Sequence, residues 1–166
     1  MIAGMRCYLA AAGVDVLKEV ANGRLVLSSS QNHLANGRFD VDLMMGTLED
    51  ALEQALREGY HGLWATGDMS WELGRQNDFS RLLEYEYRLE NFFHQHPLIG
   101  GVCQYHADTL PRKVLRMGLL AHPAVFVNET LSHINPHFLA TDSYDGAADA
   151  ELDSAITQLF RSEQAN

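Results

Sequence analysis

The sequence predicts an α/β fold, with a mostly parallel sheet of about four strands and helices on both faces. Three observations favour this class. Short runs rich in β-branched and aromatic residues alternate with longer segments whose apolar residues recur at helical spacing. Glycine, proline or asparagine stands at most boundaries between the two kinds of segment. The length of 166 residues suits one domain with a sizeable core.

The first part of the chain reads as two short helical segments followed by a strand. Residues 6–12 and 14–20 are predicted to be helical, and the second segment ends at the Asn22-Gly23 turn. The compact apolar run 25–27 is predicted to be a strand that gives way to serines. A second turn is predicted at Asn36-Gly37.

The clearest predicted helix begins after Asp40, whose side chain suits the N-cap position. Phe39 and Met44 can form a hydrophobic staple across that cap, and Gly59 ends the helix. The apolar residues of this helix recur at helical spacing and would form one buried face: Val41, Met44, Met45, Leu48, Leu52, Ala55 and Leu56.

Strands and helices alternate after this helix, with the following predicted bounds: strands at 62–66, 99–104 and 124–127, a helix from the Ser80 cap to about Phe93, and a helix from Pro111 to near His122-Pro123. A loop with Asn135-Pro136 follows, and then a final helix at about 147–161. We therefore expect residues 1–140 to form the α/β domain and residues 141–166 to form an acidic linker and the C-terminal helix.

Charge and composition argue against several classes of partner. The formal net charge is −10 and no run of lysine or arginine occurs, so no direct nucleic-acid binding is expected. The longest uncharged stretch, 91–107, contains Pro97 and histidines, so no membrane span is predicted. The two cysteines make neither a disulfide framework nor a zinc spacing, and no signal peptide is evident. A reducing, cytoplasmic location is therefore predicted.

A small-molecule site is predicted where the strands end. The carboxyl ends of parallel strands share one edge, and open α/β sheets bind ligands at that edge. Polar groups from four segments would gather there, at 28–30, 66–68, 104–106 and 128–129. Trp71 would add an apolar wall, which is usual in sites for small ligands. The alternative is that these are ordinary turn residues at strand ends.

Glu86 falls inside the apolar face of its predicted helix. A carboxylate in that position costs several kcal/mol unless it is paired or protonated. The candidate partners are Arg75, Arg81, Arg88 and the loop that carries Asp68. If Glu86 braces the wall of the site, Glu86→Gln should lower stability or ligand affinity. The alternative is that Glu86 lies at the margin of the face and reaches water.

No metal, cofactor or catalytic machinery is predicted. The histidine pairs at 94/96 and 133/137 lack the geometry of helical metal ligands, and Cys103 reads as a small buried residue in a strand. The chain contains no phosphate-binding glycine loop and no Gly-x-Ser-x-Gly elbow. An enzyme that uses Asp68 and Glu86 as an acid/base pair is the least favoured function.

Six segments carry a resemblance that covers most of residues 10–138: Gly37-Arg38-Phe39-Asp40, Gly59 to Trp71, Leu83-Glu84-Tyr85-Glu86 with Arg88-Leu89, Cys103-Gln104-Tyr105, His122-Pro123 and Asn135-Pro136. In this order they resemble the MEDS family, the methanogen/methylotroph DcmR-type sensory domain. The resemblance implies a non-catalytic sensory domain of prokaryotic signalling that binds a simple hydrocarbon derivative and acts on a signalling partner. It also implies an α/β core similar to RecA- and KaiC-like domains, here without the P-loop unit.

Carried over position by position, the resemblance implies these ligand-binding residues: Asp68, Met69, Trp71, Tyr85, Glu86, Cys103, Tyr105, His122 and Asn135. The chain departs from the family at Asp68, where glutamate is usual, and at Glu90, where asparagine is common. The family's usual first strand and helix, before residues 12–15, are expected to be missing. A sheet without them would expose an edge or an apolar face, so a homodimer or higher assembly is predicted. The alternative function is a degenerate RecA/KaiC-like assembly or interaction domain that binds no ligand.

Overall fold

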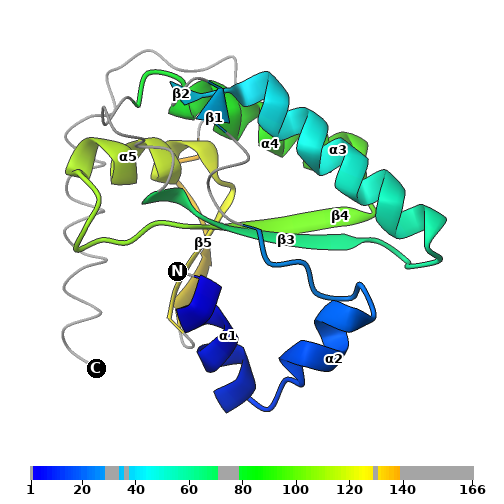
Figure 1. Ribbon diagram of the computed structural model, residues 1–166. Helices are drawn as coiled ribbons and strands as arrows, with labels where there is room; N and C mark the ends of the chain where they lie inside the picture. Colours follow the sequence, from blue (N-terminus) through cyan, green and yellow to red (C-terminus); the bar gives the residue numbers. More distant parts are fainter. Residues whose placement is uncertain (1, 29–33, 36–37, 71–78, 129–130, 139–166) are drawn as a thin grey trace.

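The computed structural model describes residues 2–28, 34–35, 38–70, 79–128 and 131–138 (Figure 1). Its helices are α1 (Ile2–Ala11), α2 (Val16–Ala21), α3 (Val41–Arg57), α4 (Leu82–Gln95) and α5 (Arg112–Ala121). Its strands are β1 (Leu34–Ala35), β2 (Arg38–Phe39), β3 (Leu63–Asp68), β4 (Ile99–Gln104), β5 (Ala124–Asn128) and β6 (Leu131–Ile134). The predicted final helix and the turn at residues 36–37 lie outside the described residues.

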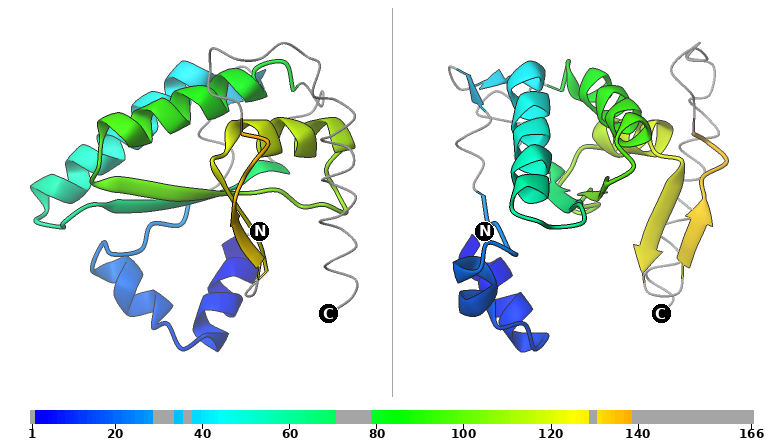
Figure 2. Two further views of the ribbon diagram at one scale, coloured as in Figure 1. Left: turned by 180° about the vertical axis from the view of Figure 1, so that it is seen from behind. Right: turned by 90° about the vertical axis from the view of Figure 1, so that its right-hand side faces the viewer.

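A parallel pair of strands, β3 and β4, lies at the centre of the fold. Leu63 is opposite Ile99 and Asp68 is opposite Gln104, and α4 lies in the chain between the two strands. Helices α3, α4 and α5 lie on one side of the pair, and α1 and α2 lie on the other (Figures 1 and 2). The predicted α/β class is therefore confirmed in its coarse form.

The predicted sheet of about four mostly parallel strands is not found in the described residues. Strand β5 pairs with β6 in antiparallel register, because the chain turns back on itself and the Asn135 N–H then donates to the Pro123 carbonyl at 2.8 Å. β6 itself was predicted as a loop. The predicted strand at 25–27 is also wrong: the N–H groups of Arg24 and Leu25 donate back to the Glu19 carbonyl at the end of α2.

Helix α3 begins and ends where the sequence predicts. Asp40 Oδ1 accepts a hydrogen bond from the Leu43 N–H at 3.1 Å, which satisfies one of the N–H groups left unpaired at a helix start. Gly59, at φ +87°, lets the chain leave the helix in a left-handed conformation that other residues adopt only with strain. Phe39 packs against the core cluster that contains Met44, and its ring meets Tyr85 edge to face.

Helix α4 differs from its prediction at the cap. Its N-cap residue is Arg81, which makes no side-chain cap bond, and not Ser80. The Arg81 guanidinium instead pairs with Glu84 in the first turn. Strand β4 has the predicted bounds, and α5 starts directly after Pro111 as predicted. Among the helices of the described ranges, none has both the length and the apolar character needed to cross a lipid bilayer.

The core lies between the three helices on one side and the strand pair. Its main cluster consists of buried residues from α3, α4, α5 and the loops after β3 and β4: Val41, Met44, Met69, Leu82, Tyr85, Leu89, Leu110 and Val114. A second cluster of Leu52, Phe92 and Ile99 extends it along the strands. The apolar face of α3 thus packs as its spacing predicts, and α4 contributes the largest share of the core.

The other face of the strand pair carries exposed apolar side chains. Trp64 is 72% exposed and Val102 is 47% exposed, both on the face away from α4. The Trp64 ring lies across Gly100, where an added Cβ would stand 2.9 Å from the ring. Helices α1 and α2 lie on this side (Figure 2). The Tyr60 hydroxyl donates a 2.7 Å hydrogen bond to the carbonyl of Asn22, the residue that follows α2. We call the surface of Trp64 and Val102 the open face.

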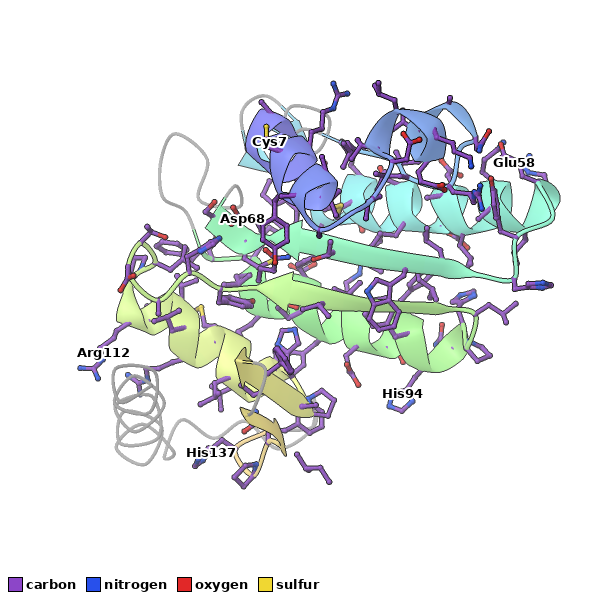
Figure 3. The ribbon with its side chains drawn as sticks, turned by 90° about the horizontal axis from the view of Figure 1, so that it is seen from below. Cys7, Glu58, Asp68, His94, Arg112 and His137 are labelled. Atoms are coloured by element: carbon purple, nitrogen blue, oxygen red, sulfur yellow. The ribbon has the colours of Figure 1, made fainter. Side chains whose placement is uncertain are left out.

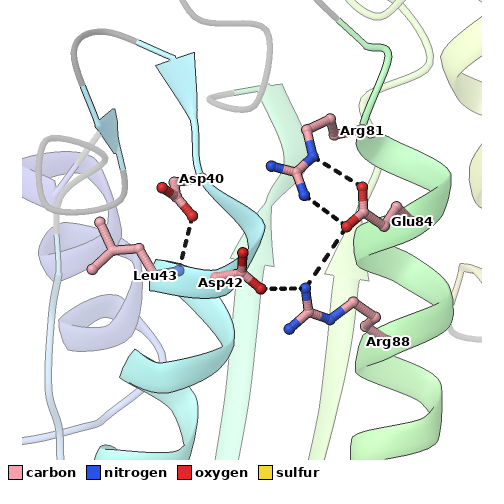
Figure 4. A network of polar contacts seen from close by, with 6 residues as sticks. All are labelled: Asp40, Asp42, Leu43, Arg81, Glu84 and Arg88. Carbon is pink, nitrogen blue, oxygen red and sulfur yellow. Dashed lines mark hydrogen bonds and ion pairs between the residues drawn. The ribbon is translucent and has the colours of Figure 1, made fainter.

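A surface ion network joins α3 to α4 (Figure 4). Arg88 lies 2.6 Å from Asp42 and 3.7 Å from Glu84, and Arg81 pairs with Glu84 at 2.7 Å. Hydrogen bonding to Arg88 lowers the pKa of Asp42, and hydrogen bonding to Arg81 lowers the pKa of Glu84. The network therefore stabilises the fold at pH values above the ordinary pKa range of carboxyl groups. That contribution is lost as the pH falls through the lowered folded-state pKa values.

Arg88→Gln tests this link between the helices. At neutral pH and low salt we expect the melting temperature to fall by about 2 °C, since exposed ion pairs contribute little individually. The difference should vanish in strong salt and in acid, where Asp42 and Glu84 become protonated. Lys113→Gln, on the exposed part of α5, removes the same charge and is the control. An equal fall in melting temperature in both variants at every pH would contradict a stabilising role for the ion pairs of Arg88.

Candidate functional site

Four polar side chains from separate elements meet inside the helical side of the fold. They are Glu86 from α4, Cys103 from β4, Tyr105 just beyond β4, and His122 directly after α5. We call these four residues the Glu86 cluster. Glu86 is only 2% exposed, so a carboxylate lies at its centre in a largely apolar region.

Local structure explains how these side chains come together. Leu82, Tyr85 and Leu89 place one face of α4 in the core, and Glu86 lies on that same buried face. Side chains alternate between the two faces along β4. This puts Cys103, and Tyr105 just beyond the strand, on the side facing the helices, while Val102 and Gln104 are exposed. The prediction that Glu86 is buried is therefore confirmed, and the alternative that it reaches water is wrong.

Of the predicted arginine partners of Glu86, neither Arg81 nor Arg88 contacts it. The Tyr105 hydroxyl donates to Oε1, Cys103 Sγ lies 3.5 Å from Oε2, and His122 Nε2 lies 3.4 Å from Oε2. Arg81 and Arg88 instead pair on the surface with Glu84 and Asp42, where their charges stay hydrated. Arg75 lies outside the described residues.

The electrostatics of the Glu86 carboxylate are set first by burial. Loss of hydration raises its pKa, and nearby Glu90 acts in the same direction. His122, Tyr105 and Cys103 oppose this rise, because a positive imidazole and hydrogen-bond donors favour the ionised carboxylate. The balance between burial and the groups beside Oε2, His122 and Cys103, therefore governs the charge of this carboxylate.

His122 is held in a defined orientation. Its Nδ1 lies 2.7 Å from the Gly118 carbonyl oxygen. A carbonyl oxygen only accepts hydrogen bonds, so Nδ1 carries the proton in this contact and Nε2 points toward Glu86. The ring also meets Tyr105 edge to face, with centroids 6.0 Å apart. The His122 side chain is 25% exposed and connects the buried carboxylate with solvent.

Asn135 holds the backbone at the end of α5, next to His122. Its side-chain amide donates to the Leu119 carbonyl and, at 2.8 Å, to the His122 carbonyl, and its Oδ1 accepts from the His137 N–H at 2.9 Å. These bonds satisfy carbonyl groups at the end of α5 that a helix leaves without partners. Asn135 therefore fixes the backbone that presents His122 and is a positioning residue.

The remaining predicted site residues are not shown in polar contact with Glu86. Asp68, at the carboxyl end of β3 (Figure 3), accepts from the Ser70 N–H at 2.9 Å and has His106 Nε2 3.5 Å from Oδ2. Met69 and Tyr85 are buried in the core cluster. Trp71 lies outside the described residues. The structure thus brings together Glu86 with the three residues of its cluster, whereas Asp68, opposite Gln104 on β4, has Ser70 and His106 as its polar partners.

Sequence reasoning missed that three of these side chains carry metal-ligating atoms. Donor atoms of Glu86, Cys103 and His122 all lie within 4.8 Å of one another. We predicted no metal site, because local histidine and cysteine spacings gave none. The three donors come from separate elements, so no local spacing reveals them. The available signals were a glutamate on an apolar face, a cysteine in a strand and a histidine ending a helix.

The fold and this cluster describe a small α/β domain with a buried polar centre. The family model of the "MEthanogen/methylotroph, DcmR Sensory domain", MEDS, matches residues 2–123. The chain therefore belongs to the MEDS family of sensory domains, as its motifs predicted. Comparisons with curated proteins and with solved structures gave no match. The family match includes the whole Glu86 cluster, and Asn135 lies beyond it.

Gly118→Ala tests how closely α5 approaches the cluster. A Cβ at Gly118 would stand 2.7 Å from the Tyr105 ring, so the ring or the helix must move. We expect the free energy of unfolding to fall by about 1–3 kcal/mol, the usual cost of overpacking. Gly46→Ala, also inside a helix but facing open space, should instead raise it by up to about 1 kcal/mol. Urea denaturation measures both, and equal shifts would contradict the packing described.

Proposed function

We propose that this chain is a non-catalytic sensory domain that binds a small organic molecule, of the simple hydrocarbon-derivative class, at the Glu86 cluster. The observation that carries the proposal is a carboxylate 2% exposed, with a hydroxyl, a thiol and an imidazole directed at it. Few polar groups converging inside an apolar region are typical of sites for small ligands. Membership of a sensory family supports the same function.

The cluster is suited to signalling because it joins three elements. Glu86 belongs to α4, Cys103 to β4 and His122 to the end of α5, so a molecule bound among them contacts all three at once. A ligand that prefers one packing of these elements shifts the population toward that packing. A partner signalling protein would then read the changed surface of the helices.

The non-catalytic part of the proposal rests on the sequence. It contains neither the nucleophile elbow that α/β-hydrolases use nor the phosphate-binding glycine loop that P-loop nucleotide hydrolases use. An acid/base pair of Asp68 and Glu86 receives no support from the geometry, since the two carboxylates have different partners.

Ligand binding is tested with short-chain alcohols, aldehydes, carboxylates and haloalkanes, using ligand-observed saturation-transfer NMR. We expect at least one class to bind, and Tyr105→Phe to weaken that binding about tenfold through loss of one hydrogen bond near the ligand. Glu86→Gln should lower stability or affinity as well. Tyr60→Phe removes a hydroxyl that donates to Asn22 outside the cluster and is the control. Equal affinities in both tyrosine variants, or no binding by any compound, would refute the proposal.

We further propose that the chain forms a homo-oligomer through the open face. Trp64 is large, apolar and 72% exposed, and Val102 lies diagonally from it on the neighbouring strand, two residues beyond Gly100. Adjacent apolar side chains of this kind mark protein contacts more often than isolated ones do. The same surface supports the second candidate function, an assembly domain that binds no ligand.

Light scattering during size-exclusion chromatography tests the assembly. We expect a dimer or larger species at micromolar concentration, and mostly monomer for Trp64→Glu, because a charge buried in an interface is strongly unfavourable. Leu17→Glu on α2, equally exposed in the monomer, should leave the assembly unchanged. A monodisperse wild-type monomer would refute the oligomer.

A further inference from the structure

We propose that Glu86, Cys103 and His122 bind a divalent transition-metal ion, with Zn²⁺ as the ion that fits best, and leave one coordination position open. The three side chains offer one oxygen, one sulfur and one nitrogen from α4, β4 and the end of α5. In the part of the chain that the structure describes, this is the group of side chains with metal-ligand chemistry and spacing.

The two distances from Glu86 Oε2 match those of a tetrahedral site. Zinc bonds of about 2.0–2.3 Å at tetrahedral angles separate an oxygen and a nitrogen ligand by about 3.4 Å, and an oxygen and a sulfur ligand by about 3.6 Å. Glu86 Oε2 lies 3.4 Å from His122 Nε2 and 3.5 Å from Cys103 Sγ. The third pair, His122 Nε2 and Cys103 Sγ, lies within 4.8 Å, so an ion bound between the three donors would draw these two side chains together.

The orientation of His122 calls for a proton or a cation between Nε2 and Glu86 Oε2, and a metal ion can take that place. Because Nδ1 donates to the Gly118 carbonyl, neutral His122 presents the lone pair of Nε2 to the Glu86 oxygen. Two lone pairs facing each other repel unless a proton or a cation lies between them. Metal-binding histidines usually donate their other ring N–H to a backbone carbonyl or a carboxylate, which is the arrangement found here.

Neighbouring groups complete the support that metal ligands need. The Tyr105 hydroxyl donates to Oε1 of Glu86, which leaves Oε2 directed at the sulfur and the imidazole. Asn135 holds the His122 carbonyl and so fixes the ligand's backbone. Hydrogen bonds to the outer atoms of metal ligands orient them and commonly decide affinity.

The donor set also selects the ion. A thiolate and a carboxylate together neutralise a divalent cation, so the filled site carries no net charge in its buried environment. Thiolate and imidazole favour Zn²⁺ over Mg²⁺ or Ca²⁺, which prefer oxygen. Three protein ligands leave a fourth position for an exchangeable molecule. In this last step the inference rests on the proposed function: the oxygen or another donor atom of the small organic ligand would occupy that position.

Cobalt binding to the full chain, stripped with a chelator and kept reduced, tests the site. We expect one Co²⁺ per chain, with a thiolate-to-cobalt charge-transfer band and the intense visible bands of tetrahedral cobalt, both bleached by added Zn²⁺. Cys103→Ser should abolish the charge-transfer band and weaken Zn²⁺ binding at least about a hundredfold, as loss of a ligand should cost no less than loss of its support. Cys7→Ser, at the exposed cysteine of α1, should change neither.

A second pair of variants covers the case in which Cys103→Ser fails to fold. His122→Gln should weaken Zn²⁺ binding similarly, whereas His94→Gln, on the exposed surface of α4, should not. Absence of the charge-transfer band in wild type, or its survival in Cys103→Ser, overturns the metal site. The organic compounds are tested separately on metal-free protein. Organic binding without a cobalt band overturns the metal site alone, and a cobalt band that no compound alters overturns the proposed ligand position alone.

Discussion

The buried carboxylate of Glu86 is the constraint around which the helical side of this domain is organised. A charge removed from water must be neutralised or hydrogen-bonded, and the groups that do so come from β4, the loop after it and the end of α5. Each of these elements is therefore tied to α4 by a directional contact in addition to apolar packing. Gly118 allows the Tyr105 ring to approach α5, and Asn135 secures the helix end that carries His122.

Local signals were enough to predict much of the fold. The α3 helix was predicted from Asp40 and Gly59, because capping and a left-handed exit depend on the residue itself. The β4 strand was predicted from its apolar run between turn residues. What failed depended on backbone hydrogen bonds that composition does not reveal: residues 25–27 have the composition of a strand, but the Leu25 N–H donates to the Glu19 carbonyl in α2. The antiparallel pairing of β5 likewise depends on a contact with Asn135 across the hairpin.

The candidate site was likewise predictable only where a local signal exists. Helical periodicity predicted that Glu86 is buried, and the family motifs supplied Cys103, Tyr105 and His122 without saying that they meet. The predicted partners were Arg75, Arg81, Arg88 and the loop that carries Asp68. Long cationic side chains are most stable where their heads stay in water, and Arg81 and Arg88 form their ion pairs there. The carboxylate in the core instead has the Tyr105 hydroxyl, the Cys103 thiol and the His122 imidazole as its partners. Their proximity is a tertiary property that no spacing along the chain encodes.

Asn135 has a consequence for where the functional unit ends. The family match stops at residue 123, one residue after the last member of the Glu86 cluster. The amide that holds the Leu119 and His122 carbonyls comes from a hairpin beyond that boundary. A fragment cut at the family limit, or a chimaera that grafts only the matched residues onto another protein, would keep every side chain of the cluster and lose the brace that aims the histidine. The hydrogen bonds that hold the backbone of His122 therefore extend beyond the family match, to Asn135 at the end of the β5–β6 hairpin.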